Sequence, residues 1–518
     1  MKLNLGCGKD YRPGFVNIDA RSDVEADLVL DITRKLPFAD GSVDEVLAQD
    51  VLEHLTPQQL SALLQEVSRV LRLGGRLCVR LPDIDAVISR FAADPDTRNL
   101  FLYGDTSQSG VWGAHKSGYT LNSFAALCLT HHFKLLNYRS VDTNYELEFS
   151  KRPVHLQPKK ILFVNQSLGT GGAETFNTGL LAWLRKQGIQ VSAWVTHPRF
   201  AKQLSARRLP VILDIIGDWK GLVKALVLWP LGVIMYAVVL WQNQDADIVL
   251  LTGFIEKIII TPLAKLLRMG VVWIEFGPLE TVFDKFWGLP KLLYRAVSHL
   301  PDAVVMPTYN TLSHNLSIGR ISRFKVKVIP CAEDIGPRPV QVEKDLVVCV
   351  SRLEPGKGQD LLLLAWPQVL RSIPTAKLRI VGEGELYASL VSLAHNLKNV
   401  TLTGWVQDAI AEVAKAKVCV FPSVWPLEGF GLAMIEAMSQ NKPVVAFAVG
   451  PAPEIVDRRS GVLVPAGDLP GLADAIIKML RHPVIGSRQT YLRRYTFSQI
   501  GPQYLDVLKY VMATHQAI

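Results

Sequence analysis

Apolar and polar positions alternate in short runs along the whole chain, and the first 153 residues show this pattern clearly. Helical periodicity covers residues 57–71, and the pair Gly74-Gly75 stands where C-cap glycines would end that helix. A second helix is predicted at 121–130, whereas the basic, proline-bearing segment 150–160 has no periodicity and is predicted to be a linker. The apolar runs predict strands at residues 2–5, 15–19, 26–31, 43–47, 76–81, 133–141 and 146–150.

Two further alternations of the same kind follow the linker. In the first, a helix is predicted at 176–187 between strands at 161–164, 192–195, 211–215, 248–251, 271–274 and 303–306. The second begins at Asp345, and its last helical pattern covers 497–512. Alternating strands and helices predict parallel sheets covered on both faces. A chain of 518 residues is also too long for one ordinary core. The predicted fold class is therefore α/β, with domains at 1–153, 154–340 and 341–518.

Two apolar or aromatic segments raise the question of a membrane. Residues 225–241 carry no charge over 17 positions, which is at the short end of the ~17–25 residues that a membrane span needs. Because the segment contains Pro230 and Gly232 and lies between two predicted strands, a buried or membrane-skimming helix is expected, with an integral anchor as the alternative. Residues 283–295 mix aromatic and basic side chains, which predicts an amphipathic surface helix or a patch that rests on lipid headgroups.

Composition narrows the choice of partners. Hydrophobic residues make up 49% of the chain, charged residues 20%, and the net charge is +9, which suits phosphate-bearing ligands or an anionic membrane surface. No zinc-finger spacing or basic-aromatic array argues for nucleic acid. Six widely spaced cysteines fit reduced thiols rather than disulfides or a metal site, and the N-terminus lacks the apolar stretch of a signal peptide. We therefore expect a cytoplasmic protein, with peripheral contact at the inner face of the cytoplasmic membrane left open.

The stretch 421–438 reads as a strand end, a glycine-bearing loop and a helix framed by two carboxylates. Glu428 precedes the helix, and Glu436 lies inside it. Gly429 and Gly431 allow a ligand to approach the backbone, and the exposed N–H groups of a helix start attract phosphate. The pattern predicts a site for a phosphorylated sugar.

Three other glycine-bearing turns follow predicted strands, at 171–174, 351–358 and 382–384. Ligands of α/β sheets bind beyond the carboxyl ends of the strands, so these turns are expected to line a common crevice. Arg352 and Lys357 would bring positive charge to a diphosphate leaving group. For the turn of Gly382 and Gly384, a purely structural role is the alternative.

Together these motifs resemble the family 4 glycosyltransferases of the GT-B fold, over about residues 159–518. The resemblance implies two facing Rossmann-like domains that hold a nucleotide-diphosphate sugar and transfer the sugar with retention and without a metal. Its implied catalytic residues are Glu436 at the ribose, Glu428 at the donor sugar or nearby phosphate, and the cations Arg352 and Lys357. The loop 404–407 would cover the base, and the last helix would cross back over the N-terminal half. The residues implied to bind the nucleotide-sugar are Gly171, Gly172, Gly382, Trp405, Val406, Phe430, Gly431 and Leu432.

Two positions depart from that family's usual pattern. A histidine is common near one strand end of the N-terminal half, where this chain has Glu275. The turn commonly written with an Asn-Gly pair reads Ile-Pro-Cys-Ala-Glu at 329–333. Donor orientation or acceptor contacts are therefore expected to differ.

The N-terminus carries a second glycine turn, KLNLGCGKD, followed by VNIDA. Gly6 and Gly8 allow close approach of a ligand, and Asp19 could accept hydrogen bonds from two ribose hydroxyls. With the later stretches LDITRKLPFADGSVDEVLAQDVLEHL and LRLGGRLCVRLP, this set resembles the class I methyltransferases that use S-adenosylmethionine, over nearly all of residues 1–150. The resemblance implies that Gly6 and Gly8 flank the amino-acid part of this cofactor and that Asp19 holds its ribose.

The same resemblance places Asp31 near the adenine and residues 49–54, beginning with Gln49, beside the transfer site. His54 or Glu53 would be the base, and a helix-start residue that holds the turn is the alternative for His54. Only eleven residues lead from Gly8 to Asp19, too few for the usual helix, which predicts a shallower cofactor pocket.

The sequence thus predicts a bifunctional enzyme of two transferase types. One part would transfer a sugar, as a retaining hexosyltransferase, from a nucleotide-sugar to a glycan or lipid-linked acceptor. The other would transfer methyl groups from S-adenosylmethionine, and the pairing suggests bacterial surface polysaccharide or lipopolysaccharide synthesis. The alternative is a glycosyltransferase whose residues 1–150 form a non-catalytic docking or acceptor-recognition module.

Overall fold

The computed structural model describes the chain except for residues 105–113, 153–155, 167–170, 211–218, 284 and 517–518. The described residues form two compact units. Unit 1 comprises Met1–Pro158 together with Leu508–Ile518, and unit 2 comprises Lys159–Val507. The predicted strand at 211–215 lies outside the described residues.

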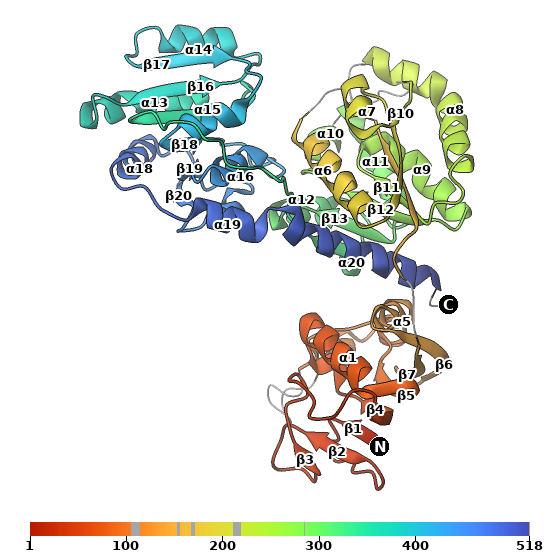
Figure 1. Cartoon of the computed structure of the whole chain (residues 1–518). Coiled ribbons are helices and arrows are strands. Elements are labelled where there is room, and N and C mark those ends of the chain that lie inside the picture. Colours follow the sequence, from red (N-terminus) through yellow and green to blue (C-terminus); the bar gives the residue numbers. More distant parts are fainter. Residues whose placement is uncertain (105–113, 153–155, 167–170, 211–218, 284, 517–518) are drawn as a thin grey trace. The chain divides into compact units, whose positions relative to one another are not determined.

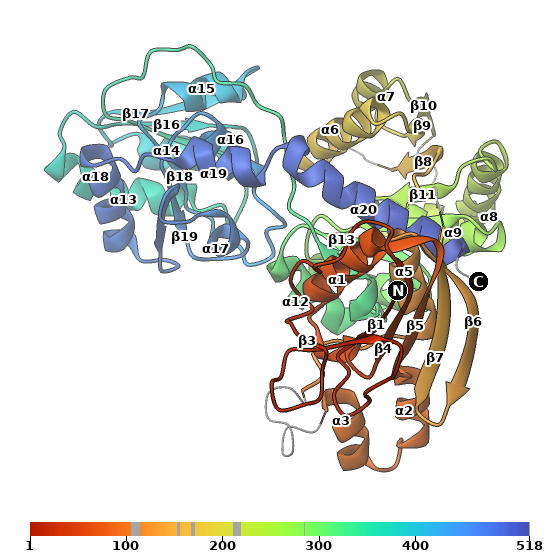
Figure 2. The same cartoon turned by 60° about the horizontal axis from the view of Figure 1, so that its bottom comes forward.

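Unit 1 is built on one seven-stranded sheet with the order β3-β2-β1-β4-β5-β7-β6. Its first five strands are parallel, but β7 runs antiparallel to both β5 and β6, which lie beside it in Figures 1 and 2. The expected all-parallel sheet is therefore wrong for this unit, because β6 and β7 form a hairpin. The strands are β1 (Lys2–Leu5), β2 (Val16–Asp19), β3 (Leu28–Val29), β4 (Val43–Gln49), β5 (Leu71–Pro82), β6 (Phe133–Val141) and β7 (Asn144–Lys151).

The first long helix of unit 1, α1, has a capping box at its N-terminus and no glycine at its C-cap. Thr56 and Gln59 form a reciprocal capping box at the start of α1, and strand β5 begins directly after this helix. The predicted glycine stop at Gly74-Gly75 is wrong, because both residues lie inside β5. A Cβ at Gly75 would lie 2.1 Å from the Leu71 side chain, so close packing explains this glycine. The helices are η1 (Leu52–His54), α1 (Pro57–Val70), α2 (Ile84–Arg90), α3 (Pro95–Tyr103) and α5 (Leu121–Thr130).

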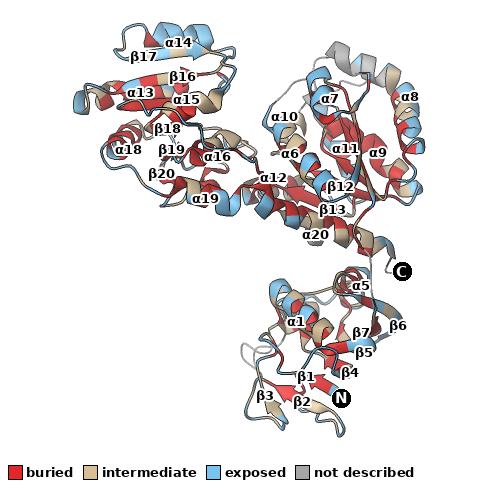
Figure 3. Ribbon diagram, viewed as in Figure 1, coloured by how far each residue is buried: buried red, intermediate tan, exposed pale blue. Residues whose placement is uncertain are grey.

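The N-terminal half of unit 2 has a parallel sheet with the order β10-β9-β8-β11-β12-β13-β14. Helices cover this sheet, and its central strands are fully buried, as Figure 3 shows. The strands are β8 (Lys160–Asn165), β9 (Gln190–Val195), β10 (Arg207–Arg208), β11 (Ile248–Leu251), β12 (Gly270–Ile274), β13 (Ala303–Met306) and β14 (Val326–Val328). The helices are α6 (Gly172–Lys186), α7 (Pro198–Leu204), α8 (Trp219–Trp241), α9 (Phe254–Leu266), α10 (Glu280–Phe283), η3 (Lys285–Gly288), α11 (Leu289–Val297), α12 (Tyr309–Ile318) and η4 (Arg323–Lys325).

The apolar segment 225–241 forms most of α8 and has two different faces. Tyr236, Val239 and Leu240 are buried in the core of this half, whereas other apolar side chains of α8 are exposed (Figure 3). Within the described ranges, no helix combines the length and the apolarity that crossing a membrane requires. The predicted surface helix at 283–295 is divided: α10 ends at Phe283, and α11 begins after the left-handed Gly288.

The C-terminal half of unit 2 has a second parallel sheet, with the order β17-β16-β15-β18-β19-β20. Its strands are β15 (Leu346–Val350), β16 (Lys377–Val381), β17 (Val400–Gly404), β18 (Val418–Phe421), β19 (Val444–Phe447) and β20 (Gly461–Val464). Its helices are α13 (Gln359–Ser372), α14 (Tyr387–Ala394), α15 (Ala409–Lys415), α16 (Leu432–Ser439), α17 (Ala452–Ile455), α18 (Leu469–Arg481) and α19 (Ser487–Arg494), followed by α20 (Phe497–Gln516).

The first part of α20 packs on the N-terminal half, as the sequence predicts. The ring of Phe176 on α6 lies 5.7 Å from the rings of both Phe497 and Tyr504. Glycines make the close approach possible, because a Cβ at Gly179 would lie 2.1 Å from the Phe497 ring. The last residues of α20 belong to unit 1, where Ala513 packs against α5.

Candidate functional site

A cavity of about 620 Å³ lies in unit 2 beyond the carboxyl ends of β15, β16 and β18. Its wall takes residues from both halves, since Gly172, Ala173 and Phe276 join side chains of the C-terminal half. Gly171 is the one predicted nucleotide-sugar residue that does not line it. The predicted residues that do are Gly172, Arg352, Lys357, Gly382, Trp405, Val406, Glu428, Phe430, Gly431, Leu432 and Glu436.

Lys357 and Glu428, which both line this cavity, form an ion pair. The Lys357 ammonium lies 2.8 Å from both Glu428 carboxylate oxygens, and the Ser423 hydroxyl donates to the same carboxylate at 3.1 Å. Lys357 is only 8% exposed, so its charge is held in a poorly solvated place. The neighbouring Gly358 is left-handed, and a Cβ there would lie 1.9 Å from the Pro422 carbonyl oxygen. Close backbone packing thus joins the two predicted motifs.

Arg352 supplies the second positive charge in the cavity wall. Its guanidinium donates to Glu354 at 2.6 Å and is otherwise exposed, so it can turn toward a ligand at little cost. The backbone behind it is rigid, because the Gln359 amide donates to the Arg352 carbonyl at 2.9 Å. Among the described residues that line the cavity, there is no other lysine or arginine besides Arg352 and Lys357.

Glu436 projects from α16 into the cavity and is half-buried. Burial, with the carboxylate of Glu333 nearby, raises the pKa of Glu436 to about 8. Glu333 belongs to the turn that departs from the family pattern, and among the described residues its Oε2 has no hydrogen-bond partner. Burial likewise raises the pKa of Glu333. Two adjacent carboxyls that resist ionisation can both donate and accept hydrogen bonds toward a ligand's hydroxyls.

The two halves touch around Gly429, a contact that sequence reasoning missed. A Cβ at Gly429 would lie 1.9 Å from the Phe276 carbonyl oxygen, and the hydroxyls of Thr308 and Thr311 donate to the Gly429 carbonyl at 3.3 and 3.4 Å. Glu275, which stands at the expected histidine position, does not line the cavity. It is buried, with one oxygen 2.8 Å from the Lys257 ammonium. Phe276, the next residue, lines the cavity instead.

The far end of the cavity is formed by Trp405, Val406 and Glu383. Trp405 is 65% exposed, and its backbone N–H donates to Glu383 at 3.4 Å. Gly382 lines the cavity and also needs to be glycine, because a Cβ there would lie 2.0 Å from the Ser351 carbonyl oxygen. Gly382 therefore both permits the close packing of this turn and lines the cavity.

The predicted cofactor residues of unit 1 gather at the carboxyl ends of β1 and β2. Gly6 and Gly8 are both left-handed, and the Gly8 N–H donates to Asp19 Oδ2 at 2.8 Å. The other oxygen of Asp19 accepts from the Arg21 N–H at 2.9 Å and faces the Arg21 guanidinium at 3.4 Å. Each oxygen of this carboxylate therefore already accepts from the chain's own donors, and a ribose would share the carboxylate with Arg21.

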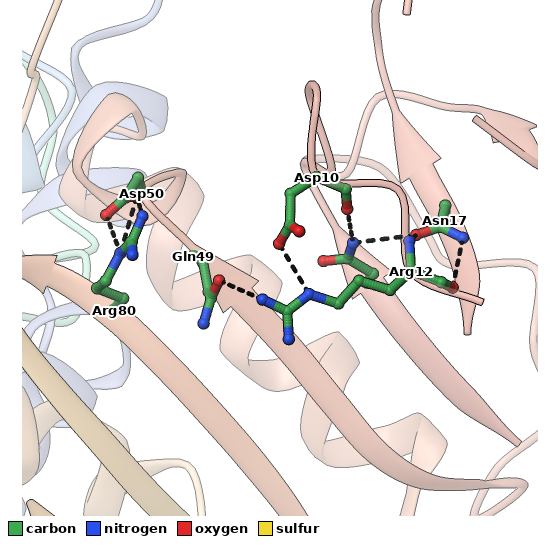
Figure 4. Close-up of polar contacts among 7 residues, drawn as sticks. Asp10, Arg12, Asn17, Gln49, Asp50 and Arg80 are labelled. Carbon is green, nitrogen blue, oxygen red and sulfur yellow. Dashed lines mark hydrogen bonds and ion pairs between the residues drawn. The ribbon is translucent and has the colours of Figure 1, made fainter. Parts of the chain in front are cut away.

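Gln49 ends β4 and Asp31 follows β3, and the chain's own groups engage both side chains. The Gln49 amide oxygen accepts from the Arg12 guanidinium at 2.9 Å, and Arg12 also pairs with Asp10, so this short loop reaches across to the end of β4 (Figure 4). Gln49 also lines a second cavity of about 200 Å³, whose other residues come from β5, β6 and β7. Asp31 is exposed and accepts from the Thr33 N–H and hydroxyl, which lowers the pKa of Asp31.

His54 lies in η1, after the carboxyl end of β4. Its Nδ1 lies 3.1 Å from the carbonyl oxygen of Ala114. Glu53 beside it is almost completely buried.

Two segments of the chain match known protein families. Residues 6–79 match the model of a methyltransferase domain family, and residues 344–482 match the model of the glycosyl transferases group 1 family. A GDP-mannose-dependent monoacylated alpha-(1-6)-phosphatidylinositol monomannoside mannosyltransferase of Corynebacterium glutamicum is 36% identical over 147 residues, which cover 27% of this chain and 39% of the relative. A poly(ribitol-phosphate) alpha-N-acetylglucosaminyltransferase of Staphylococcus aureus is 30% identical over 33% of this chain and 36% of the relative. The chain thus spans about two fifths of the length of the curated relatives it matches.

Two solved structures are similar to about two thirds of this chain. Anabaena Alr3699/HepE in complex with UDP has a TM-score of 0.56 at 19% identity and covers 67% of this chain and 99% of its own. The apo form of the lipopolysaccharide outer core galactosyltransferase WaaB has a TM-score of 0.52 at 16% identity, over 67% of this chain and 98% of its own. At such identities the likeness shows the fold alone.

Proposed function

We propose that this chain, which joins a methyltransferase-family domain to a group 1 glycosyltransferase domain of the GT-B fold, transfers a sugar from a nucleotide-diphosphate sugar to an acceptor hydroxyl. The observation that carries the proposal is the convergence of Arg352, Lys357, Glu428 and Glu436 on one cavity. Its volume of about 620 Å³ lies in the range of small-molecule sites.

The cations of this cavity would act on the leaving group. Lys357 and Arg352 stabilise the diphosphate as its charge develops, and the effect is largest for Lys357 because it is shielded from water. Glu428 holds the Lys357 ammonium and binds the donor sugar or the adjacent phosphate. Glu436 holds the ribose, and the Trp405 loop covers the base. With no protein nucleophile assigned, an acceptor hydroxyl that attacks from the leaving-group side gives retention, and the chemistry we assign needs no metal.

The relatives indicate which substrates to test first. The matched mannosyltransferases carry GDP-mannose and phosphatidylinositol in their names, and a structural neighbour is bound to UDP. We therefore propose a GDP- or UDP-hexose donor and a glycan or lipid-linked acceptor in bacterial surface polysaccharide or lipopolysaccharide synthesis. The exposed face of α8 supports peripheral contact of a cytoplasmic protein with the inner face of the membrane. Its residues Val227, Leu231, Ile234 and Val238 are 44–72% exposed at helical spacing.

Calorimetric titration with UDP and GDP tests the site. Wild-type protein is expected to bind one of them, and Lys357→Met is expected to bind it at least tenfold more weakly, because the site loses its shielded positive charge. Lys344→Met is the matched control, since Lys344 is exposed and lies outside the cavity wall. Equal affinity in both variants would contradict the assignment.

For unit 1 we propose methyl transfer with S-adenosylmethionine, which supplies the methyl group when bound. The placement of Gly6, Gly8 and Asp19 at adjacent strand ends suits such a group, although Arg21 competes for the Asp19 carboxylate. Asp31 and Gln49 would border the adenine and the transfer site, respectively. Asp19→Ala is expected to weaken S-adenosylmethionine binding at least tenfold in calorimetry, with Asp23→Ala as the exposed control.

The occupied Asp19 carboxylate also favours a second function for residues 1–150, a non-catalytic docking or acceptor-recognition module. In that case wild-type protein produces no binding heat with S-adenosylmethionine even at high concentration. The sugar-transfer proposal does not depend on this result, because its residues lie in unit 2.

A further inference from the structure

Three side chains of unit 1 that can each ligate a metal lie close together: Glu53, His54 and His115. One ligand atom of each lies within 4.8 Å of those of the other two. The chain holds them together although His115 is remote in sequence, because the N–H groups of Lys116 and Ser117 donate to the Glu53 carbonyl at 2.7 and 3.1 Å. Backbone hydrogen bonds of this unit therefore hold the segment of His115 beside the segment of Glu53 and His54.

Both histidines are oriented by backbone carbonyls. Nδ1 of His54 lies 3.1 Å from the Ala114 oxygen, and Nδ1 of His115 lies 3.1 Å from the Phe101 oxygen. Because a carbonyl only accepts, each Nδ1 carries a proton, and Nε2 is then the nitrogen that a neutral ring offers to a metal. A carbonyl that fixes one ring nitrogen is the usual second partner of a metal-binding histidine.

Glu53 supplies a buried carboxylate, one oxygen of which lacks a hydrogen-bond partner among the described residues. Its side chain is 4% exposed, and within the described ranges its Oε2 makes no hydrogen bond. A buried carboxylate oxygen without a hydrogen-bond partner is costly. A bound cation would remove this cost. The two histidines are only half-buried, which leaves a route from solvent.

We propose that Glu53, His54 and His115 bind a divalent transition-metal ion of the Zn²⁺ class. Two imidazoles and one carboxylate suit Zn²⁺, Co²⁺ or Fe²⁺ rather than Mg²⁺ or Ca²⁺, which prefer oxygen ligands. Three protein ligands leave a coordination position open for water or a substrate oxygen. The assignment gives His54 a ligand role in place of the base expected from the sequence.

The consequence for unit 1 rests on its proposed methyl transfer. Two of its members, Glu53 and His54, lie within residues 49–54, the segment expected to border the transfer site. A metal there would bind and acidify an acceptor hydroxyl. Metal binding itself is independent of that activity and is measured without S-adenosylmethionine.

The test uses untagged full-length protein stripped with a chelator and dialysed against Zn²⁺, with bound metal measured by mass spectrometry. Co²⁺ is the second probe, because its visible d–d bands report nitrogen and oxygen ligands. Wild type is expected to retain one more equivalent of metal than His115→Ala and Glu53→Gln, and both variants are expected to lose the Co²⁺ bands. His395→Ala, at an exposed histidine of unit 2, is expected to behave as wild type.

Glu53→Gln keeps the shape of the side chain, and circular dichroism and the thermal unfolding midpoint of the metal-free protein establish that each variant folds. Variants that fold and keep the stoichiometry and Co²⁺ spectrum of wild type would overturn the proposal, as would wild type that retains no more metal than His115→Ala. Loss of metal with normal S-adenosylmethionine binding would leave the proposed function of unit 1 intact.

Discussion

The ion pair of Lys357 and Glu428 is the central feature of the proposed donor site. The side chain of Lys357 is 9% exposed and that of Glu428 is 22% exposed, so water screens their attraction only in part. A diphosphate that approaches Lys357 finds an ammonium already held in place, rather than one that must give up its rotamer freedom. In the proposed function, this pair would therefore present a preorganised cation to the leaving group.

Glu436 should make donor binding pH-dependent. Its pKa of about 8 means that the carboxyl is mostly protonated at pH 6.5 and half ionised near pH 8, and the ionised form accepts ribose hydrogen bonds more strongly. We expect nucleotide affinity of wild type to rise by about tenfold between pH 6.5 and 8.5 relative to Glu436→Gln. Calorimetric titrations of both proteins use the same nucleotide, so the effect of the nucleotide's own ionisation cancels in the ratio of the two affinities. A constant ratio of the two affinities would show that Glu436 does not contact the ligand.

Most of these site residues could be predicted because each follows a strand in a recognisable turn. Phe276 and Thr308 could not, since their approach to Gly429 depends on how the two halves close rather than on local pattern. The cluster of Glu53 and His115 was missed for the same reason: 62 positions separate these residues, counted from 53 to 115, and only the backbone bonds of 116 and 117 bring them together.

At the scale of elements, the packing of α20 on α6 joins the C-terminal end of unit 2 to its N-terminal half. Gly179 permits it, since any larger residue would meet the Phe497 ring. Gly179→Val is expected to lower the free energy of unfolding by about 2 kcal/mol through overpacking. Thermal unfolding checks this, with Gly336→Val as control, because nothing lies within 4 Å of a Cβ at Gly336. Equal midpoints for the two variants would contradict the packing.

The strand pattern of unit 1 was predicted well in position but not in direction. β6 matches its predicted range, yet β7 returns antiparallel through the left-handed Asp142. A short polar turn between two alternating strands is a hairpin signal, and Asp142-Thr143 fits it. The glycine pair at 74–75 does not mark the end of α1, because β5 begins at Leu71, directly after the last helical residue.

At the scale of the whole molecule, the predicted α/β class and the pairing of a methyltransferase-family domain with a GT-B glycosyltransferase domain are confirmed. The roles of the individual site residues stay predictions. The grouping of Leu508–Ile518 with unit 1 was not foreseen, because the apolar periodicity of a helix shows which face is buried but not which unit covers it.

The most direct measurement is turnover of a panel of GDP- and UDP-hexoses, followed as release of the nucleoside diphosphate with and without candidate acceptors. We predict that wild type and Lys344→Met turn over one donor at similar rates. Lys357→Met should be slower by at least about 100-fold, because the leaving group loses its shielded counter-charge. Unchanged turnover in folded Lys357→Met, or no turnover of any donor by wild type in the presence of acceptors, would contradict the account.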